Sequence, residues 1–549
     1  MTVGGGERTA TVVRGSFGRS ADRRSLLDRA HRGDIQGALG RIQSFDTHPR
    51  TSLGKRIAAL LAIMGPGLIV TSSDAGGLSV FSQAGQNYGL NFLWLLPVLG
   101  LVLFVNQEMV ARLGAVTGVG HARLIFERFG RSWGAFALGD LLLLNLLTIV
   151  TEFIGISLAL GYFGVSPYIS VPLTAVALVL LAATGSFQRW ERVMVALVAA
   201  DLVAIPLVLV SHPHPVTVAR AVVPGLGGAV GASGIVFVLA LVGNAIAPWQ
   251  LFFQQSSVVD KRITPRWLSY ERADTLIGTV LFVVGAAAVL AACAFAFGHT
   301  PLHGTFADAG TVARGLAQRL GDSAGSLFAL ALLNASILGA AVVTLATSYA
   351  IGDVSGRKHS LHRGWRDARA FHGCYAALIA LAAGAVLVPT LPLGIITTLV
   401  QALAGVLLPS ATVFLLVLAN DRALLGPRTN PRWLNALSTV VVGVLLVLSA
   451  LLIVTTLHPE LGERVIAVVL LGGTLASVLV GLVVAGSGMG REPFAGTPWE
   501  RATWSMPPLE SLSPPVASRA RIVGLTVLRG YLAIAAVLLV VKAVQLATT

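Results

Sequence analysis

Long apolar runs separated by short polar stretches dominate the chain. Runs of about 20 residues, the length of a helix that spans a bilayer, recur from residue 57 almost to the end. The pattern predicts thirteen membrane segments, at 57–86, 90–112, 133–162, 167–185, 190–210, 230–258, 274–298, 324–352, 371–389, 393–419, 434–457, 464–486 and 522–546. We therefore expect an all-α polytopic membrane protein.

Two of these segments are interrupted by residues that break an α-helix. The first contains Asp74-Ala75-Gly76-Gly77, and the sixth contains the stretch GNAIAPWQ, in which Pro248 removes a backbone donor. The two segments lie five apart, so they cross the membrane in opposite directions. Interrupted helices at equivalent positions of two halves are typical of inverted-repeat transporters, with the binding site at the interruptions. We expect a leucine-transporter-like 5+5 repeat with broken helices 1 and 6.

The same pattern divides the chain into four parts. We expect the first five-helix repeat at 53–212, the second at 228–420, and additional helices with a Pro-rich loop over 421–549. Residues 1–52 form a basic extension whose weak helical periodicity, between 25 and 45, favours a surface helix or a disordered segment. This extension has no apolar stretch, so we expect no cleavable signal peptide.

Charge and composition agree with a membrane protein and predict its orientation. Hydrophobic residues make up 55% of the chain and charged residues 12%, against about 25% charged in soluble domains. The net charge of +14 reflects basic residues that follow the even-numbered segments, for example Arg112, Arg189, Arg272 and Arg366. The positive-inside rule then predicts a cytoplasmic N-terminus in a multi-pass protein of the plasma membrane. We expect the lipid bilayer as a partner, and not nucleic acid.

Asp74 is the strongest candidate for a binding residue. An ionisable side chain inside a membrane segment is costly and marks a functional site by default. The helix breaks free the carbonyls near Thr71 and from Asn244 to Ala247, and these oxygens would face the same site as the carboxylate. A carboxylate with carbonyl oxygens is a hard ligand set that suits a cation. The alternative is that Asp74 only caps the broken helix.

Three stretches of the chain carry a resemblance to a known family. They are GPGLIVTSSDAGG in the first segment, GNAIAPWQLFFQQS in the sixth and VQALAGVLLPS in the tenth. Over its first ten segments the chain resembles the natural-resistance-associated macrophage protein (NRAMP) metal transporters. The resemblance implies that Asp74 is the metal-binding aspartate and that Gln401 approaches the ion. The chain departs from the family where Gly77 replaces an asparagine, Ala247 a methionine and Trp249 a histidine.

These departures bear on which ion is carried. A thioether favours transition metals, so its absence at Ala247, with the lost amide at Gly77, leaves a wider site with oxygen ligands. Mg²⁺ releases water reluctantly and is usually held through one or two carboxylates with several waters retained. In this respect the chain is similar to the NRAMP-related magnesium transporters, which carry Mg²⁺ and Mn²⁺. The alternatives are a proton-coupled Mn²⁺ or Fe²⁺ transporter and an organic-cation or amino-acid symporter of the same architecture.

The predicted proton pathway is interrupted. Proton-coupled members have two acids in the third segment, and this chain keeps Glu152 but has Ile149 at the other position. Trp249 replaces the histidine, and a relay needs successive titratable groups. We predict alternating access without obligatory proton coupling, driven by about 4.6 kcal/mol per 100 mV for a divalent ion. Asp201, close to the middle of the fifth segment, either lines the pathway or is a buried hydrogen-bonded acid.

The remaining residues give no sign of enzymatic chemistry. We find no paired carboxylates, histidine cluster or nucleophile near a membrane surface in the sequence. Cys293 and Cys374 lie far apart in or beside apolar runs and are expected to be buried hydrophobes. We therefore expect a monomeric transporter that is not an enzyme and needs no cofactor, with the metal ion as its substrate.

Overall fold

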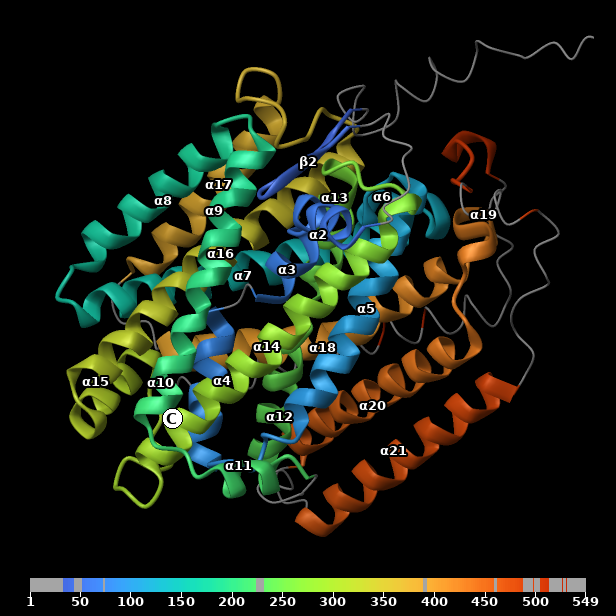
Figure 1. The fold of residues 1–549 in the computed structure, drawn as a ribbon. Helices are drawn as coiled ribbons and strands as arrows, with labels where there is room; N and C mark the ends of the chain where they lie inside the picture. Colours follow the sequence, from blue (N-terminus) through green and yellow to red (C-terminus); the bar gives the residue numbers. More distant parts are fainter. Residues whose placement is uncertain are drawn as a thin grey trace, which may run out of the picture.

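The computed structural model describes residues 33–43, 52–72, 75–223, 232–388, 393–458, 462–486, 497, 504–512, 526 and 530 of the 549-residue chain. This part is a bundle of α-helices with one short β-hairpin (Figure 1). Ten of its helical stretches are long and apolar enough to cross a membrane, and a bent helix pair makes an eleventh. The all-α polytopic fold is confirmed.

The long helices follow the predicted segments, because the length of an apolar run sets the length of its helix. They are α5 (Leu95–Thr117), α7 (Arg131–Tyr162), α8 (Pro167–Ala183), α14 (Leu268–Phe297), α16 (Asp322–Ser355), α17 (Arg369–Val386), α18 (Leu393–Ala419), α20 (Arg432–Leu457) and α21 (Glu463–Gly486). Short connecting elements that the apolar pattern did not predict are α6 (His121–Phe129), α11 (Pro215–Ala221), η3 (Pro265–Trp267), α15 (Ala309–Leu320), α19 (Arg422–Leu425), η4 (Gly426–Arg428) and η5 (Leu509–Ser511). The predicted segment 522–546 lies outside the described residues, apart from 526 and 530.

The first predicted segment consists of three helices. They are α2 (Leu53–Ile63), α3 (Pro66–Ser72) and α4 (Ala75–Tyr88). The break between α3 and α4 was predicted, but a second bend of 56° separates α2 from α3. Pro66 begins α3, and the carboxylate of Asp274 accepts hydrogen bonds from the backbone N–H groups of Gly65 and Gly67, at 3.1 and 2.8 Å. The local proline and the carboxylate of a distant helix therefore fix this bend together.

The fifth and sixth segments are also divided. The sixth has the predicted break, between α12 (Ala232–Ala245) and α13 (Pro248–Asp260). In the fifth, α9 (Phe187–Ala200) passes through a 3₁₀ turn, η2 (Asp201–Val203), into α10 (Ala204–Val210). We did not predict this turn, although Pro206 in α10 is a local signal for it, because its ring clashes with the carbonyl of Leu202 four residues earlier and it has no N–H group to donate.

The two broken helices lie antiparallel beside each other. The first half of the first segment, α3, packs on the second half of the sixth, α13. Likewise α4, the second half of the first segment, packs on α12, the first half of the sixth. Such pairing is what two inverted repeats produce, because equivalent helices then run in opposite directions. The breaks of the first and sixth segments are thereby brought together in the interior of the bundle (Figure 1).

Helices α12 and α18 cross with their backbones in close contact. A Cβ atom at Gly243 would overlap the backbone carbonyl of Gln401, and one at Gly405 would overlap the carbonyl of Leu239. Small residues at such crossings let membrane helices approach closely and gain van der Waals contact. The crossing holds the end of α12 that carries Asn244.

Residues 33–43 correct our prediction for the N-terminal extension. They contain a hairpin of β1 (Ile35–Gly37) and β2 (Gly40–Ile42) in which Ile35 pairs with Ile42, instead of the predicted helix or disordered segment. Both isoleucines are buried against α2. At the turn, Ala38 N–H donates to Glu191 Oε2 at 2.6 Å, and Arg192 Nε donates to the Ala38 carbonyl at 3.1 Å. Tertiary contacts with α2 and α9 therefore override the weak helical periodicity.

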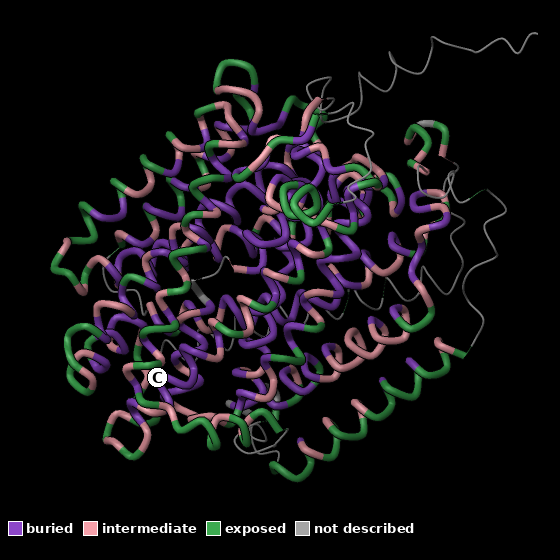
Figure 2. Tube along the Cα trace, viewed as in Figure 1, coloured by how far each residue is buried: buried purple, intermediate pink, exposed green. Residues whose placement is uncertain are grey.

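The last two described helices lie at one edge of the bundle. Helix α20 packs on α18 and α12, and α21 packs on α20 (Figure 1). Figure 2 shows α21 exposed along most of its length, although its side chains are apolar. An apolar, exposed helix of this length is suited to contact with lipid.

Candidate ion-binding cavity

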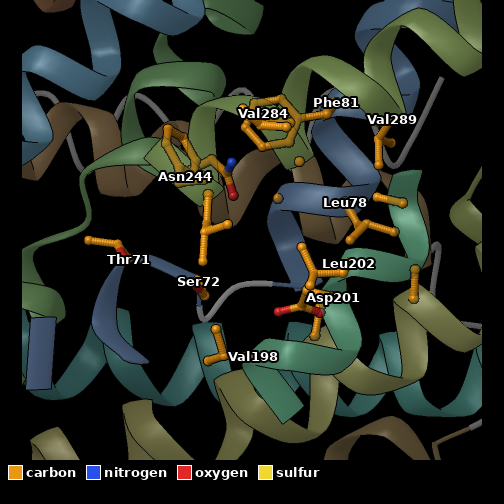
Figure 3. A pocket seen from close by; sticks show the side chains of 18 of the residues that line it. Thr71, Ser72, Leu78, Phe81, Val198, Asp201, Leu202, Asn244, Val284 and Val289 are labelled. Carbon is orange, nitrogen blue, oxygen red and sulfur yellow. The ribbon is translucent and has the colours of Figure 1, made fainter. Parts of the chain in front are cut away.

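A cavity of about 100 Å³ lies where the two helix breaks meet (Figure 3). The end of α3 contributes Thr71 and Ser72 to its wall, and the start of α4 contributes Gly77. Across from them, Asn244 of α12 and Gln250 of α13 flank the second break. Inverted-repeat transporters bind their substrates at this position.

The remainder of the cavity wall is mostly apolar and comes from α4, α9, η2, α10, α14 and α16. Among its residues are Val198, Leu202, Ile205, Leu281, Phe282 and Ala331. Asp201, in the 3₁₀ turn η2, is the single carboxylate among the lining residues that the structure describes. No described lining residue carries a sulfur atom or an imidazole ring.

Three oxygen atoms at the cavity are buried without a hydrogen-bond partner among the described residues. They are Ser72 Oγ, Asn244 Oδ1 and Asp201 Oδ2. Buried polar atoms are nearly always paired, so a group of unpaired oxygens around one cavity indicates a missing ligand or water. Because all three are oxygens that accept hydrogen bonds or coordinate metals, they suit a hard cation and the water around it.

The Asn244 side chain lies beside Gly77. A Cβ atom at Gly77 would be 2.9 Å from Asn244 Oδ1 and 3.0 Å from Nδ2, so the amide occupies the space of a side chain at 77. Asn244 is 2% exposed. Asn244 was predicted at the site for its backbone carbonyl and not for its side chain, although an amide next to a helix break in an apolar segment is a usable signal.

Gln250 connects the two breaks and was not predicted. Its Oε1 accepts the backbone N–H of Ala247, the N-cap residue of α13, at 3.1 Å. Its Nε2 donates to the carbonyl of Val70, in the last turn of α3, at 3.5 Å. Both partners are backbone groups that a helix end leaves without an intrahelical bond. Gln250 thus positions the α3 and α13 ends relative to each other.

The other predicted residues lie beyond the cavity wall. Ala247 caps α13 with its backbone, and Trp249 is fully buried in the first turn of that helix. Gln401 is buried in α18 at the crossing with α12. Glu152 of α7 is buried against Gly339 of α16, at a place where a Cβ atom would not fit. None of the four is among the residues that line the cavity.

Asp74 lies outside the described residues, in the two-residue interval between the last residue of α3, Ser72, and the first of α4, Ala75. The predicted role of Asp74 therefore remains a prediction. Within the part of the chain that the structure describes, no group of three or more His, Cys, Asp or Glu residues could hold a metal ion. An ion in the cavity would depend on isolated carboxylates, hydroxyls and amides.

Paired broken helices with a cavity at their breaks define an inverted-repeat membrane transporter. Residues 67–455 match the family described as "Natural resistance-associated macrophage protein-like", and the chain belongs to this family. It is a multi-pass membrane transporter and not an enzyme. The family that the sequence motifs indicated is confirmed.

Curated relatives and solved structures agree with this assignment. The chain is 30% identical to the divalent metal cation transporter MntH of Ralstonia nicotianae, over 69% of this chain and 87% of the relative. It is 28% identical to the divalent metal cation transporter MntH 1 of Pseudomonas aeruginosa, over 70% of this chain and 90% of that relative. The crystal structure of the Eremococcus coleocola manganese transporter is similar, with a TM-score of 0.60 and 21% identity over 81% of this chain and 99% of that one. The structural likeness shows the fold.

Proposed function

We propose that the chain is a transporter of divalent metal cations that carries Mg²⁺, and also Mn²⁺, by alternating access. The observation that supports this most is the cavity between the two helix breaks, whose described lining offers unpaired oxygens and neither sulfur nor imidazole. Oxygen ligands suit Mg²⁺ and Mn²⁺, whereas softer ligands select later transition metals. The names of the curated relatives support the divalent-metal class.

The size of the cavity supports an ion that keeps part of its water shell. Its volume of about 100 Å³ far exceeds the roughly 10–15 Å³ that one water needs by the same measure. Mg²⁺ dehydrates reluctantly and is bound in proteins with several waters. We propose that Asp74 supplies the principal charge, and that Thr71, Gly77 and Asn244 line the hydrated ion. We also propose that Ala247 and Gln401 lie near the ion, and for these two residues the family resemblance is the only support.

We further propose that transport does not require a proton. Glu152 packs against Gly339 away from the cavity lining, while Ile149 and Trp249 interrupt the succession of titratable groups. The second candidate function is proton-coupled Mn²⁺ transport; the name of the curated relative supports a divalent metal cation as the substrate. We also propose a plasma-membrane location with a cytoplasmic N-terminus, a monomer, and the division into 1–52, 53–212, 228–420 and 421–549.

Uptake into liposomes tests the function directly. We expect purified protein to admit Mg²⁺ and Mn²⁺ in preference to Ca²⁺ and Zn²⁺, and Asp74→Ala to lower Mg²⁺ uptake at least about tenfold, a loss of about 1.4 kcal/mol. Asp322→Ala, at an exposed aspartate that begins α16, is the control and should behave as wild type. Mg²⁺ uptake that is unchanged in Asp74→Ala would remove Asp74 from the site. Acidification of the lumen in step with Mg²⁺ entry, read with a trapped dye, would favour the proton-coupled alternative.

The ligand set predicts a designed change of selectivity. The triple variant Gly77→Asn, Asn244→Ala and Ala247→Met should raise the ratio of Mn²⁺ to Mg²⁺ uptake roughly tenfold, because it adds a soft sulfur ligand. Asn244→Ala is included to make room, since the amide of Asn244 lies 2.9–3.0 Å from a Cβ atom at residue 77. Gly77→Asn alone is the matched control and should lose uptake of both ions. An unchanged ratio in a folded triple variant would refute the ligand argument.

A further inference from the structure

We propose that Asp201 is a specificity-determining residue of the cavity, where it supplies a second negative charge that selects divalent over monovalent cations. The proposal rests on the proposed function, with the ion cavity as its site. Asp201 would act through the water shell of the ion, from the wall formed by the fifth segment. It would complement Asp74, which the sequence assigns to the break of the first segment.

The local backbone places Asp201 at the cavity. The residue begins the 3₁₀ turn η2 that separates α9 from α10, within a stretch that is apolar and long enough to cross a membrane. A 3₁₀ stretch within a helix often marks a functional hinge or a strained sequence, and Pro206 explains the turn itself, so a functional role for Asp201 is inferred from its side chain. A carboxylate at such a depth is costly and persists where it serves a function. Figure 3 shows the Asp201 carboxylate and the Asn244 amide projecting into the cavity from different walls.

One oxygen of Asp201 is held by the protein and the other is left for the cavity. Asn334 Nδ2 donates to Asp201 Oδ1 at 2.5 Å and to the carbonyl of Leu197 at 2.7 Å, so the amide is fixed between two acceptors. Asp201 Oδ2 is buried and has no hydrogen-bond partner in the described part of the chain. An aspartate that only joined two helices would be expected to pair both oxygens. The orphaned oxygen therefore indicates a ligand in the cavity.

The apolar surroundings of Asp201 leave a charge on its carboxylate poorly screened. Its neighbours in the wall include Val198, Leu202 and Phe282, and no described residue that lines the cavity is a Lys, Arg or His. In a wall of low polarity a charge is poorly screened, so it attracts a cation strongly and is unfavourable without one. With Asp74 and Asp201 both ionised, a divalent ion neutralises the cavity, whereas a single Na⁺ or K⁺ leaves one negative charge uncompensated.

Contact through water fits both the cavity and the ion. The volume of about 100 Å³ leaves room for several waters beside an ion. Groups that bind the ligands of a metal instead of the metal itself typically change its affinity 10–100-fold when they are mutated. We therefore expect removal of the Asp201 charge to weaken Mg²⁺ binding without abolishing transport.

Competition between Mg²⁺ and Na⁺ tests the proposal in liposomes. In Asp201→Asn, which keeps the shape of the side chain, the half-saturation concentration for Mg²⁺ should rise roughly tenfold, within the 10–100-fold range of such groups. Addition of 100 mM NaCl in place of an uncharged osmolyte, roughly physiological in strength, should inhibit Mg²⁺ uptake by the variant more than by wild type. Asp201→Glu retains the charge and should restore resistance to Na⁺. Asn334→Ala keeps the Asp201 carboxylate but removes the amide that anchors it. Mg²⁺ uptake by this variant should also stay resistant to Na⁺.

The controls separate this proposal from the proposed function. Absence of divalent uptake by the wild type would refute the function itself. Uptake by the wild type with unchanged half-saturation and Na⁺ sensitivity in folded Asp201→Asn would refute only the role of Asp201. If Asp201→Asn lowers only the maximal rate of Mg²⁺ uptake, Asp201 has a structural role, and this result would also refute its proposed role in selectivity. If Asp201→Asn does not elute as a single species in gel filtration, Asp201→Ser takes its place, with the same outcomes expected.

Discussion

Replacement of Lys261 by methionine is expected to destabilise the folded protein by about 3–5 kcal/mol, the usual cost of leaving one member of a buried ion pair without its partner. The Lys261 ammonium group is completely buried and makes three hydrogen bonds. It donates to Glu191 Oε1 at 2.6 Å and to the carbonyls of Ile63 and Met64 at 2.7 and 2.9 Å. Removal of the ammonium would leave a buried carboxylate and two carbonyls without this donor.

The position of Lys261 explains why the effect should be large. The residue caps α13 and ties its end to the carbonyl end of α2, where a positive charge also interacts favourably with the helix dipole. Through Glu191, whose other oxygen accepts the N–H of Ala38, the same group holds the N-terminal hairpin. Lys261→Met would therefore loosen α2, α9, α13 and the hairpin together.

Thermal unfolding in detergent measures this effect. Lys55→Met is the matched control, because Lys55 is exposed on α2 and substitutions of exposed residues usually change stability by less than about 0.5 kcal/mol. The double variant Lys261→Met with Glu191→Gln should recover part of the loss, since it no longer buries an uncompensated carboxylate. Equal unfolding temperatures for Lys261→Met and Lys55→Met would show that the buried pair is not important for stability.

The substitution Gly405→Val is the second one for which we expect a large effect on the stability of the fold. The Cβ atom would overlap the carbonyl of Leu239 and lie 3.4 Å from the backbone nitrogen of Gly243, so α12 and α18 could not keep their close crossing. Overpacking of a tight interior costs about 1–3 kcal/mol and sometimes more. Because Asn244 follows Gly243 on α12, displacement of this helix should also weaken Mg²⁺ binding.

Gly384→Val provides the comparison for this prediction. Gly384 lies in α17 with no atom within 4 Å of a Cβ added to it, so the same change of residue meets open space. We expect Gly405→Val to elute partly as aggregate in gel filtration and to unfold at lower temperature, whereas Gly384→Val should resemble the wild type. If both variants behave alike, the close crossing of α12 and α18 is not required for stability. The contact at Gly405 would then relax without loss of stability.

The spans and the two predicted breaks could be read from the sequence because their causes are local. An apolar run of sufficient length forms a helix in a membrane whatever its neighbours are, since its backbone groups must pair within the segment. Pro248 begins α13, and its ring and missing N–H group prevent α12 and α13 from forming one continuous helix. The motifs around Asp74 and Ala247 likewise lie within short stretches, and the family that they indicated is confirmed.

Elements that depend on distant residues were missed. The bend at Gly65 is fixed by hydrogen bonds to Asp274, and the hairpin at residues 35–42 depends on α2 and on Glu191. Pro206 is a local cause of the 3₁₀ turn at Asp201, but the Asp201 side chain is anchored by Asn334 on the distant helix α16. Contacts between residues far apart in the sequence decide the hairpin and the anchoring of Asp201, whereas the bend and the 3₁₀ turn also have local causes in Pro66 and Pro206.

The sequence by itself determined the membrane class, the helical spans, the broken helices and the family, because apolar length, prolines and short motifs act locally. Only the tertiary structure decided which polar groups surround the cavity. It brought the amide of Asn244 next to Gly77 and left one oxygen of Asp201 unpaired at the same cavity. The physical reason is that helix packing sets these side-chain positions, and packing depends on small residues such as Gly243 and Gly405, where helix backbones approach each other.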